Sequence, residues 1–158
     1  MQIRRAVQKD ADVIARLAAA AAAEEGGQSS LDLDRVRAHA FGQQPLFEAW
    51  LAQERHNAPV MGQAVISKSY DFRRAAPNVV LCELYVVPEA RRSGLARKLM
   101  SCVAKRARDL GARELAITTG VENGVAQRFF AAVGAQRRDA AVFMMSADGI
   151  EWLAAESL

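Results

Sequence analysis

The sequence predicts a single α+β domain with a mixed sheet, covering residues 1–158. Apolar segments with the two-residue period of strands alternate along the chain with amphipathic segments of helical period. Glycines and prolines punctuate these segments, and no linker or internal repeat divides them. With 158 residues and a hydrophobic content of 51%, the chain is long enough to bury one core.

The chain opens with a short strand, residues 2–7, which is followed by a helix. Asp10 or Asp12 is expected to cap this helix, because short acidic side chains accept hydrogen bonds from the unpaired N–H groups of a first turn. Six alanines at 18–23 are strong helix formers and continue it, and the Gly26-Gly27 pair ends it.

A second helix follows, with Ser29 or Ser30 as its cap and Gly42 as its end. Leu33 and Phe41 lie on its apolar side. The spacing then indicates a hairpin and a loop, in the order strand 47–53, turn 56–59, strand 60–70 and polar loop 71–78.

The second half of the chain continues with strands and helices. The β-branched apolar run at 79–87 is a strand that ends at Pro88. Leu95, Leu99 and Val103 begin a helical stripe that ends at Gly111. The remaining elements are a strand at 114–118, a helix from Asn123 to Gly134, a strand at 141–146 and a terminal helix at 150–156. The order β-α-α-β-β-β-α-β-α-β, with the terminal helix, indicates a mixed sheet.

Composition and charge argue against several functional classes. The net charge of +3 suits a small polyanionic ligand but is too weak to indicate a nucleic-acid partner. Two cysteines, Cys82 and Cys102, are too few for a disulfide framework or a zinc site, and we expect both to be reduced core residues. No leader-like segment or apolar stretch near 18 residues occurs, so no membrane partner and a cytoplasmic location are expected.

The turn after the strand at 79–87 is predicted to bind an anion. It leads into the start of a helix, whose first N–H groups have no intrahelical partner and carry partial positive charge. Gly94 lets a ligand approach the backbone, and Arg91 and Arg92 supply charges that bind phosphate oxygens. An ordinary turn with solvated arginines is the alternative. The phosphate-loop patterns G-x-x-x-x-G-K-[ST] and G-x-G-x-x-G do not occur at this turn.

Two motifs carry a resemblance to a known family. Arg91-x-x-Gly94-x-Ala96 directly follows a strand that ends in Leu-x-Val-x-Pro, and Asn123-x-x-Ala126-x-x-Phe129-Phe130-x-x-x-Gly134 follows later. Together with the order of elements, which covers nearly the whole chain, they resemble the GNAT superfamily of N-acetyltransferases. The resemblance implies the GNAT fold, with a mixed central sheet of six to seven strands flanked by helices. It also implies acetyl-CoA as co-substrate and no metal.

Three local features are most similar to the diamine and polyamine (spermidine/spermine-type) acetyltransferase branch. They are the segment 41–47, the Tyr70-Asp71 pair, and Gly134-Ala135 where most relatives carry Gly-Phe. This similarity implies a small-molecule amine acceptor and a homodimer.

The resemblance also implies which residues bind the cofactor. In the family, backbone groups of the central strand pair with the pantetheine arm, and N–H groups of the following turn and helix bind the pyrophosphate. Carried onto this chain, the cofactor-binding residues are Leu84, Tyr85, Val86, Arg91, Arg92, Ser93, Gly94, Leu95, Ala96, Arg97, Asn123 and Phe130. For Leu84 to Val86 a fully paired core strand is the alternative, and for Asn123 helix capping alone is a sufficient reason.

Glu83 is the candidate catalytic base. An alkylamine with a pKa of about 10.4 is almost entirely protonated at neutral pH, so a group must remove a proton before the amine attacks the thioester. Glu83 is the carboxylate within an otherwise apolar strand, where burial raises a carboxyl pKa, and the family often places an acid there. Pairing with an arginine, or a strand-edge position, is the alternative.

The family usually has Tyr where this chain has Phe130, and the tyrosine hydroxyl protonates the leaving thiolate. Phe130 cannot donate a proton, although a thiol of pKa about 8.5 can also leave as thiolate. Water, Tyr85 or Tyr70 are the possible substitutes, and a weakly active acyl-CoA-binding or sensing module is the rival function.

Glu24 and Glu25, just before Gly26-Gly27, are the candidate substrate-binding residues. Two carboxylates there can hold a cationic diamine, whereas surface charge at a helix end is the alternative. The sequence therefore predicts a cytoplasmic N-acetyltransferase that acts on a small primary amine such as a diamine, polyamine or amino-acid-like molecule. A protein-lysine or protein N-terminal acceptor is the alternative within the enzyme class.

Overall fold

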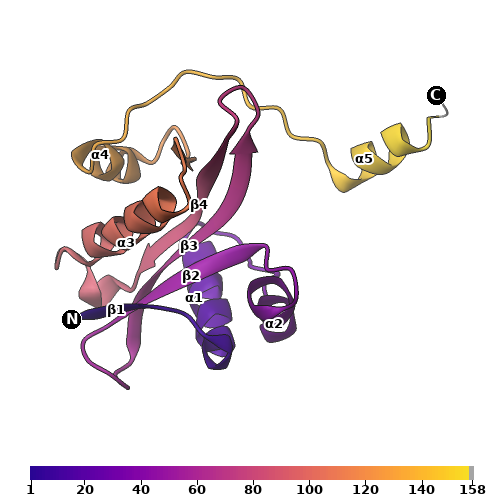
Figure 1. Cartoon of the computed structure of the whole chain (residues 1–158). Helices are drawn as coiled ribbons and strands as arrows, with labels where there is room; N and C mark the ends of the chain where they lie inside the picture. Colours follow the sequence, from indigo (N-terminus) through magenta and orange to yellow (C-terminus); the bar gives the residue numbers. More distant parts are fainter. Residues whose placement is uncertain (157–158) are drawn as a thin grey trace. The chain divides into compact units, whose positions relative to one another are not determined.

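The computed structural model describes residues 1–156, and they divide into two compact units. The first unit is Met1–Gly120, and the second begins at Val121. Figure 1 shows the sheet and three helices of the first unit, α1 (Ala11–Glu24), α2 (Leu33–Phe41) and α3 (Leu95–Asp109). The expectation of one domain over the whole chain stays a prediction.

The sheet has five strands in the order β1-β2-β3-β4-β5. Their bounds are β1 (Gln2–Arg5), β2 (Phe47–Gln53), β3 (Val60–Asp71), β4 (Ala76–Val86) and β5 (Leu115–Ile117). The first four pair antiparallel, and β4 pairs parallel with β5, so the sheet is mixed as predicted. The predicted six to seven strands are wrong, because residues 1–156 form a sheet of five.

Helices cover both faces of this sheet. Ile14 of α1 and Val36 of α2 pack with Ala49 and Leu51 of β2, which point to one face. Glu48, which directly precedes Ala49 in the strand, points to the other face and accepts two hydrogen bonds of 2.8 Å from Arg106 of α3. The first unit is therefore a sheet sandwiched between α1 and α2 on one side and α3 on the other.

Two of the predicted helix caps need correction. Asp10 occupies the N-cap position of α1, but its carboxylate makes no capping hydrogen bond to that helix and instead accepts hydrogen bonds from Arg4 and the Val7 N–H. Asp32, and not Ser29 or Ser30, caps α2, since its carboxylate accepts a 2.8 Å hydrogen bond from the Arg35 N–H. Ser29 instead bonds to the Leu31 N–H at 3.1 Å, in the turn before the helix. The short stretches Gln8–Asp10 and Pro88–Ala90 are 3₁₀ turns before α1 and α3.

The hairpin between β3 and β4 is longer than predicted. The expected loop at 71–78 is wrong over half of its length, because β3 extends to Asp71, β4 already begins at Ala76, and Pro77 pairs with Tyr70. Proline is tolerated near the start of a strand, where its missing N–H costs little. The Asp71 carboxylate accepts hydrogen bonds of 3.0 Å from the N–H groups of Arg73 and Arg74, which closes the tight turn.

The second unit contains α4 (Gly124–Ala132) and α5 (Ala147–Ala154). The predicted strand at 141–146 is wrong, since this segment is neither helix nor strand. A strand requires a neighbouring strand for its N–H and C=O groups, and the described part of this unit has none. Ser146 caps α5 by accepting a 3.1 Å hydrogen bond from the Gly149 N–H, so this helix begins earlier than the predicted residues 150–156.

Two buried carboxyl groups make the first unit sensitive to acid. Hydrogen bonds of 2.7 Å from Arg4 hold the pKa of Asp10 below its ordinary value. Burial acts to raise the pKa of Glu48, but bonds from Arg106 and Lys68 outweigh it, so the pKa is also lowered. In both cases the unfolded chain binds protons at higher pH than the folded chain does.

We therefore expect the free energy of unfolding to be maintained near neutral pH and to fall as the pH drops below about 4.5. Urea midpoints measured from neutral to acid pH test this. Glu48→Gln should flatten the acid slope, whereas Asp34→Asn, at an exposed side chain, should leave it unchanged. An unaltered slope in the Glu48→Gln protein would contradict the assignment.

Candidate active site

One edge of β4 is open where the cofactor arm was predicted to bind. Among the described residues, β4 pairs with β5 only from Val79 to Leu81, while its pairing with β3 continues to Val86. The Val87 N–H donates to the Met61 carbonyl, so alternate residues direct their backbone groups to β3. This alternation turns the backbone groups of Leu84 and Val86 to the open edge and those of Tyr85 to β3. The backbone groups of Leu84 and the N–H of Val86 can therefore pair with an added strand, whereas the Val86 carbonyl already accepts a 2.9 Å hydrogen bond from Nε of Arg91. The backbone of Tyr85 does not face this edge, contrary to the prediction.

A β-bulge lies immediately before Glu83. Val65 of β3 pairs with Glu83, but the next residue, Ile66, pairs with Leu81, so Cys82 is the extra residue of β4. The bulge turns Cys82 outward, and the expectation of a core position for this cysteine is wrong. Cys102 is half-buried. The bulge also reorients Glu83 relative to the preceding part of the strand.

Glu83 lies on the α1 face of the sheet and accepts a hydrogen bond from Nε2 of Gln63. Gln63 is fully buried on β3, and its Oε1 has no hydrogen-bond partner within the described residues. Burial raises the pKa of Glu83, the Gln63 N–H partly opposes this, and the nearby Glu25 carboxylate adds to the increase. A carboxyl group with a raised pKa is suited to exchange protons near neutral pH.

Gln63→Met is expected to raise the pKa of Glu83 further, because the side chain keeps its size but no longer donates to the carboxylate. The acid limb of the kcat/KM profile should then move to higher pH. Gln53→Met is the matched control, since Gln53 is also a buried glutamine but lies on β2. A limb that stays in place in the Gln63→Met protein, or that moves equally in both proteins, would contradict this role.

The turn between β4 and α3 has the backbone of an anion site. Arg92 and Gly94 have φ of 60° and 79°, in the left-handed region, so the chain curls tightly ahead of the helix. The Ser93 hydroxyl donates to the Ala90 carbonyl at 2.6 Å and holds this turn. The first helical hydrogen bond of α3 runs from the Lys98 N–H to the Gly94 carbonyl, so the Leu95 and Ala96 N–H groups precede it.

The structure brings three of the predicted site residues together. Both oxygens of Glu24, the last residue of α1, accept hydrogen bonds of 2.7 Å from Nη2 of Arg91. The Tyr85 hydroxyl donates to the same carboxylate at 2.9 Å, and the Arg91 guanidinium lies 5.8 Å from the Tyr85 ring centroid. Arg91 and Tyr85 together lower the pKa of Glu24. Arg91 is therefore paired with Glu24, which was predicted to bind the amine substrate, and is not simply solvated as in the alternative interpretation.

Asn123 and Phe130 lie in the second unit, which is described by itself. Asn123 caps α4, because its side-chain oxygen accepts a 3.0 Å hydrogen bond from the Ala126 N–H. Phe130 packs edge-to-face against Phe129 with ring centroids 5.4 Å apart. Cofactor contacts of Asn123 and Phe130 stay predictions.

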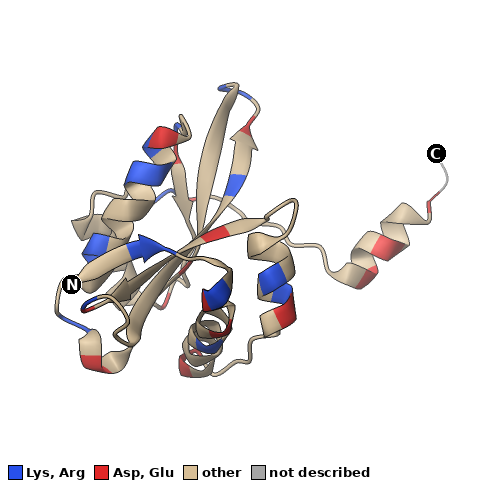
Figure 2. Cartoon of the chain, turned by 60° about the horizontal axis from the view of Figure 1, so that its bottom comes forward, with Lys and Arg blue, Asp and Glu red and all other residues tan. Residues whose placement is uncertain are grey.

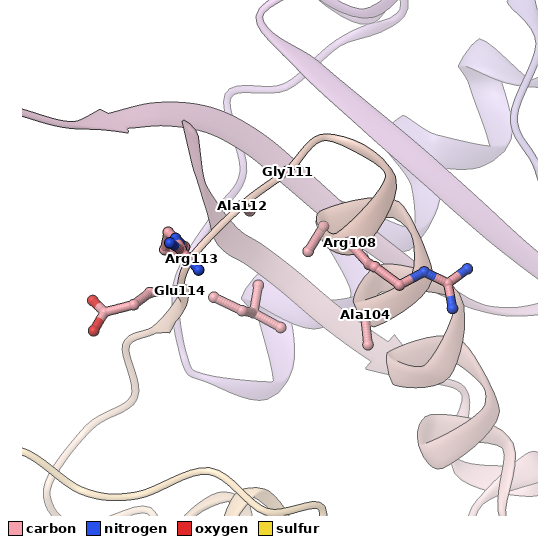
Figure 3. A pocket seen from close by; sticks show the side chains of 8 residues that line it. Ala104, Arg108, Gly111, Ala112, Arg113 and Glu114 are labelled. Atoms are coloured by element: carbon pink, nitrogen blue, oxygen red, sulfur yellow. The ribbon is translucent and has the colours of Figure 1, made fainter. Parts of the chain in front are cut away.

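A separate surface hollow of about 490 Å³ lies at the other end of α3 (Figure 3). Its lining combines small or apolar residues with three charged ones, and consists of Ala104, Ala107, Arg108, Gly111, Ala112, Arg113, Glu114 and Leu115. Since α3 has 15 residues, its two ends are roughly 22 Å apart, so this hollow is distinct from the Arg91–Leu95 turn.

Within residues 1–156 no three His, Cys, Asp or Glu side chains are grouped so that they could hold a metal ion. None of the described helices is long and apolar enough to cross a membrane. Figure 2 shows acidic and basic residues interspersed along the elements of the first unit.

Comparison with known proteins agrees with this geometry. The model of the acetyltransferase (GNAT) family matches residues 14–135. A thialysine N-epsilon-acetyltransferase of Bos taurus is 29% identical over 144 residues, which cover 86% of this chain and 84% of that protein. A probable acetyltransferase of solved structure has a TM-score of 0.79 at 21% identity, covering 92% of this chain and 99% of that one. An aminoglycoside N-acetyltransferase in complex with CoA has a TM-score of 0.69 at 22% identity, over 92% and 98% of the two chains.

Proposed function

We propose that this chain, which belongs to the GNAT family of acetyltransferases, transfers the acetyl group of acetyl-CoA to a primary amine of a small molecule that carries a second cationic group. The observation that supports this most is the placement of Glu83, half-buried beside the open edge of β4, with the Glu25 carboxylate at the end of α1 nearby. The family uses acetyl-CoA, and the two substrates would meet at this edge.

The residues present fit acetyl-CoA. The open edge at Leu84 and Val86 supplies backbone groups for the pantetheine arm, in the manner of an added strand. The left-handed residues of the turn and the start of α3 direct N–H groups to one place, where the diphosphate would bind, with Arg92 beside them.

The thioester supplies an activated acyl group, and the chain supplies proton transfer and orientation. Glu83 would take a proton from the ammonium form of the acceptor, so that the neutral nitrogen attacks the acyl carbon. The carbon–sulfur bond would then break with the sulfur leaving as thiolate, and the second proton lost by the nitrogen would pass to water. The Leu84 N–H, at the open edge directly after Glu83, would donate to the carbonyl oxygen as negative charge develops there. Because Phe130 has no hydroxyl, the thiolate would be protonated by water.

The choice of acceptor follows from the carboxylates. Glu24 and Glu25 sit at the end of α1 on the Glu83 face of the sheet, and they would attract a cation. Thialysine and aminoglycosides, which the names of the similar acetyltransferases specify, are amines that carry more than one ammonium group. A diamine, a polyamine or a lysine-like amino acid has the same chemistry, and the resemblance to the diamine and polyamine branch favours the first two.

The experiment that tests this function measures the release of free CoA thiol from acetyl-CoA in the presence of a panel of amines. We expect release to increase with 1,4-diaminobutane, spermidine or thialysine, and much less with butylamine, which lacks a second cation. Binding of acetyl-CoA without release in any of these would favour a sensing module. Release with lysine-containing peptides alone would favour a protein acceptor.

Two further aspects of the proposal concern the state of the protein in the cell. A homodimer is proposed from the resemblance, and light scattering of the purified chain would test it. A cytoplasmic location is proposed from the sequence, and cell fractionation would test it.

A further inference from the structure

Glu24 and Arg91 join the two halves of the proposed site. They are 67 residues apart in the sequence, yet both carboxylate oxygens of Glu24 lie 2.7 Å from Nη2 of Arg91. Arg91 is also tied by its Nε to the Val86 carbonyl at 2.9 Å, beside the open edge of β4. The charge of Glu24, which is proposed to bind the amine acceptor, is therefore neutralised by Arg91, which is proposed to bind the diphosphate.

This ion pair is accessible to a competing ligand. The Arg91 and Glu24 side chains are 43% and 41% exposed. By contrast, the Glu48 side chain that binds Arg106 is only 6% exposed. Solvent-exposed ion pairs contribute little to stability, whereas a buried charge that loses its partner is costly. A diphosphate, which binds the planar guanidinium of an arginine through two oxygens, can therefore displace Glu24 but could not readily displace Glu48.

Release of Arg91 would leave Glu24 with an uncompensated negative charge. Glu24 and Glu25 lie at the carboxyl end of α1, where the helix dipole adds partial negative charge, and the last turn of α1 contains no basic residue. The Tyr85 hydroxyl would remain as a hydrogen-bond donor that orients the Glu24 carboxylate. Such a site attracts a cation.

The distance to Glu83 fits a small acceptor. Tyr85 and Glu83 are two residues apart on β4, so their side chains leave the same face of the strand roughly 7 Å apart. An amine whose reacting nitrogen meets Glu83 can then place a second ammonium group, a few carbon atoms away, at the carboxylate that Tyr85 holds.

We propose that the Glu24–Arg91 ion pair couples the two substrates, because the diphosphate of CoA draws Arg91 away from Glu24 and so frees Glu24 to hold the second ammonium group of the acceptor. Arg91 is then a positioning residue for the acceptor as well as a ligand of the cofactor. This inference rests on the proposed function and adds to it that an acceptor with two cations binds best after CoA. By reciprocity, the acceptor must strengthen CoA binding by the same factor.

The test is calorimetric binding of 1,4-diaminobutane to the whole chain, with and without saturating CoA, which carries the diphosphate but no acetyl group to transfer. In the wild-type protein CoA should lower the Kd of the diamine about fivefold or more. Arg91→Ala should bind the diamine several-fold more tightly than wild type when CoA is absent, because Glu24 is already free, and CoA should have no further effect. Arg91→Gln should behave in the same way, and Glu24→Gln should bind the diamine weakly in both states.

Two controls separate this coupling from a general loss of charge. Arg108→Ala, which removes an exposed arginine paired with Asp109 at the far end of α3, should keep wild-type coupling. Butylamine, which lacks the second ammonium group, should show no coupling in any variant. Equal or weaker diamine binding by both Arg91 variants without CoA, or coupling that persists in them, would overturn the inference. If the wild-type protein acetylates diamines but the Arg91 variants give either of these contradicting results, the coupling inference fails and the proposed function stands. If the wild-type protein acetylates no amine, the proposed function itself fails.

Discussion

Glu83→Gln is expected to lower kcat by about 10²- to 10⁴-fold, which is the usual contribution of a positioned general base. Glutamine has the size of glutamate and can still accept the hydrogen bond from Gln63, but it cannot take a proton from the acceptor. The Kd of acetyl-CoA should not change, since the backbone edge and the turn are untouched. Steady-state kinetics with a diamine acceptor and calorimetry with acetyl-CoA measure the two quantities.

The pH profile separates a base from a merely structural carboxylate. Because burial raises the pKa of Glu83, wild-type activity should fall with decreasing pH as this carboxylate becomes protonated. The Glu83→Gln protein should lack that limb. Glu54→Gln, at an exposed position outside the site, is the matched control and should keep both rate and profile. A Glu83→Gln protein with wild-type kcat, or with the limb retained, would remove Glu83 from the mechanism.

Arg92→Ala is expected to weaken acetyl-CoA binding by about 10- to 150-fold, which corresponds to the roughly 1.5–3 kcal/mol of a hydrogen bond to a charged group. Arg92 has φ of 60°, and alanine meets the same backbone constraint, so the turn should not be strained further. At saturating acetyl-CoA, kcat should be near that of wild type. Titration of acetyl-CoA into both proteins at several salt concentrations provides the measurement, and the affinity of wild type should fall more steeply with salt.

Arg108→Ala serves again as the comparison, because it also removes one exposed positive charge of the same unit but at the other end of α3. Its affinity for acetyl-CoA should be close to that of wild type. Equal affinities of the Arg92→Ala and wild-type proteins would show that the Arg92 side chain does not bind the diphosphate.

Much of the fold was predictable because it is determined by local signals. Strands β2, β3 and β4 arise from apolar and β-branched runs. Helix α3 lies between Gly94 and Gly111, both of which have positive φ. The turn between β4 and α3, proposed to bind the diphosphate, was predictable for the same reason, since a strand, a glycine and a helix start are adjacent in the sequence.

The contacts that complete the candidate site join distant residues, and no local pattern indicates them. Gln63 and Glu83 are 20 residues apart, and Tyr85 and Glu24 are 61 apart. The bulge at Cys82 depends on the register between β3 and β4, which alternation along one strand does not specify. For the segment 141–146 a local pattern was present but the long-range partner was not. Its apolar pattern is that of a strand, but the described second unit contains no strand to pair with it.

The central claim is that the N–H groups and arginines after β4 bind the diphosphate of the acyl donor. The most direct test is a calorimetric comparison of acetyl-CoA with S-acetylpantetheine, which has the same acyl thioester but no diphosphate. We expect acetyl-CoA to bind with measurable heat and a Kd at least about 100-fold lower than that of S-acetylpantetheine, because several charge-assisted hydrogen bonds distinguish them. Equal dissociation constants, or no heat with acetyl-CoA, would contradict the account.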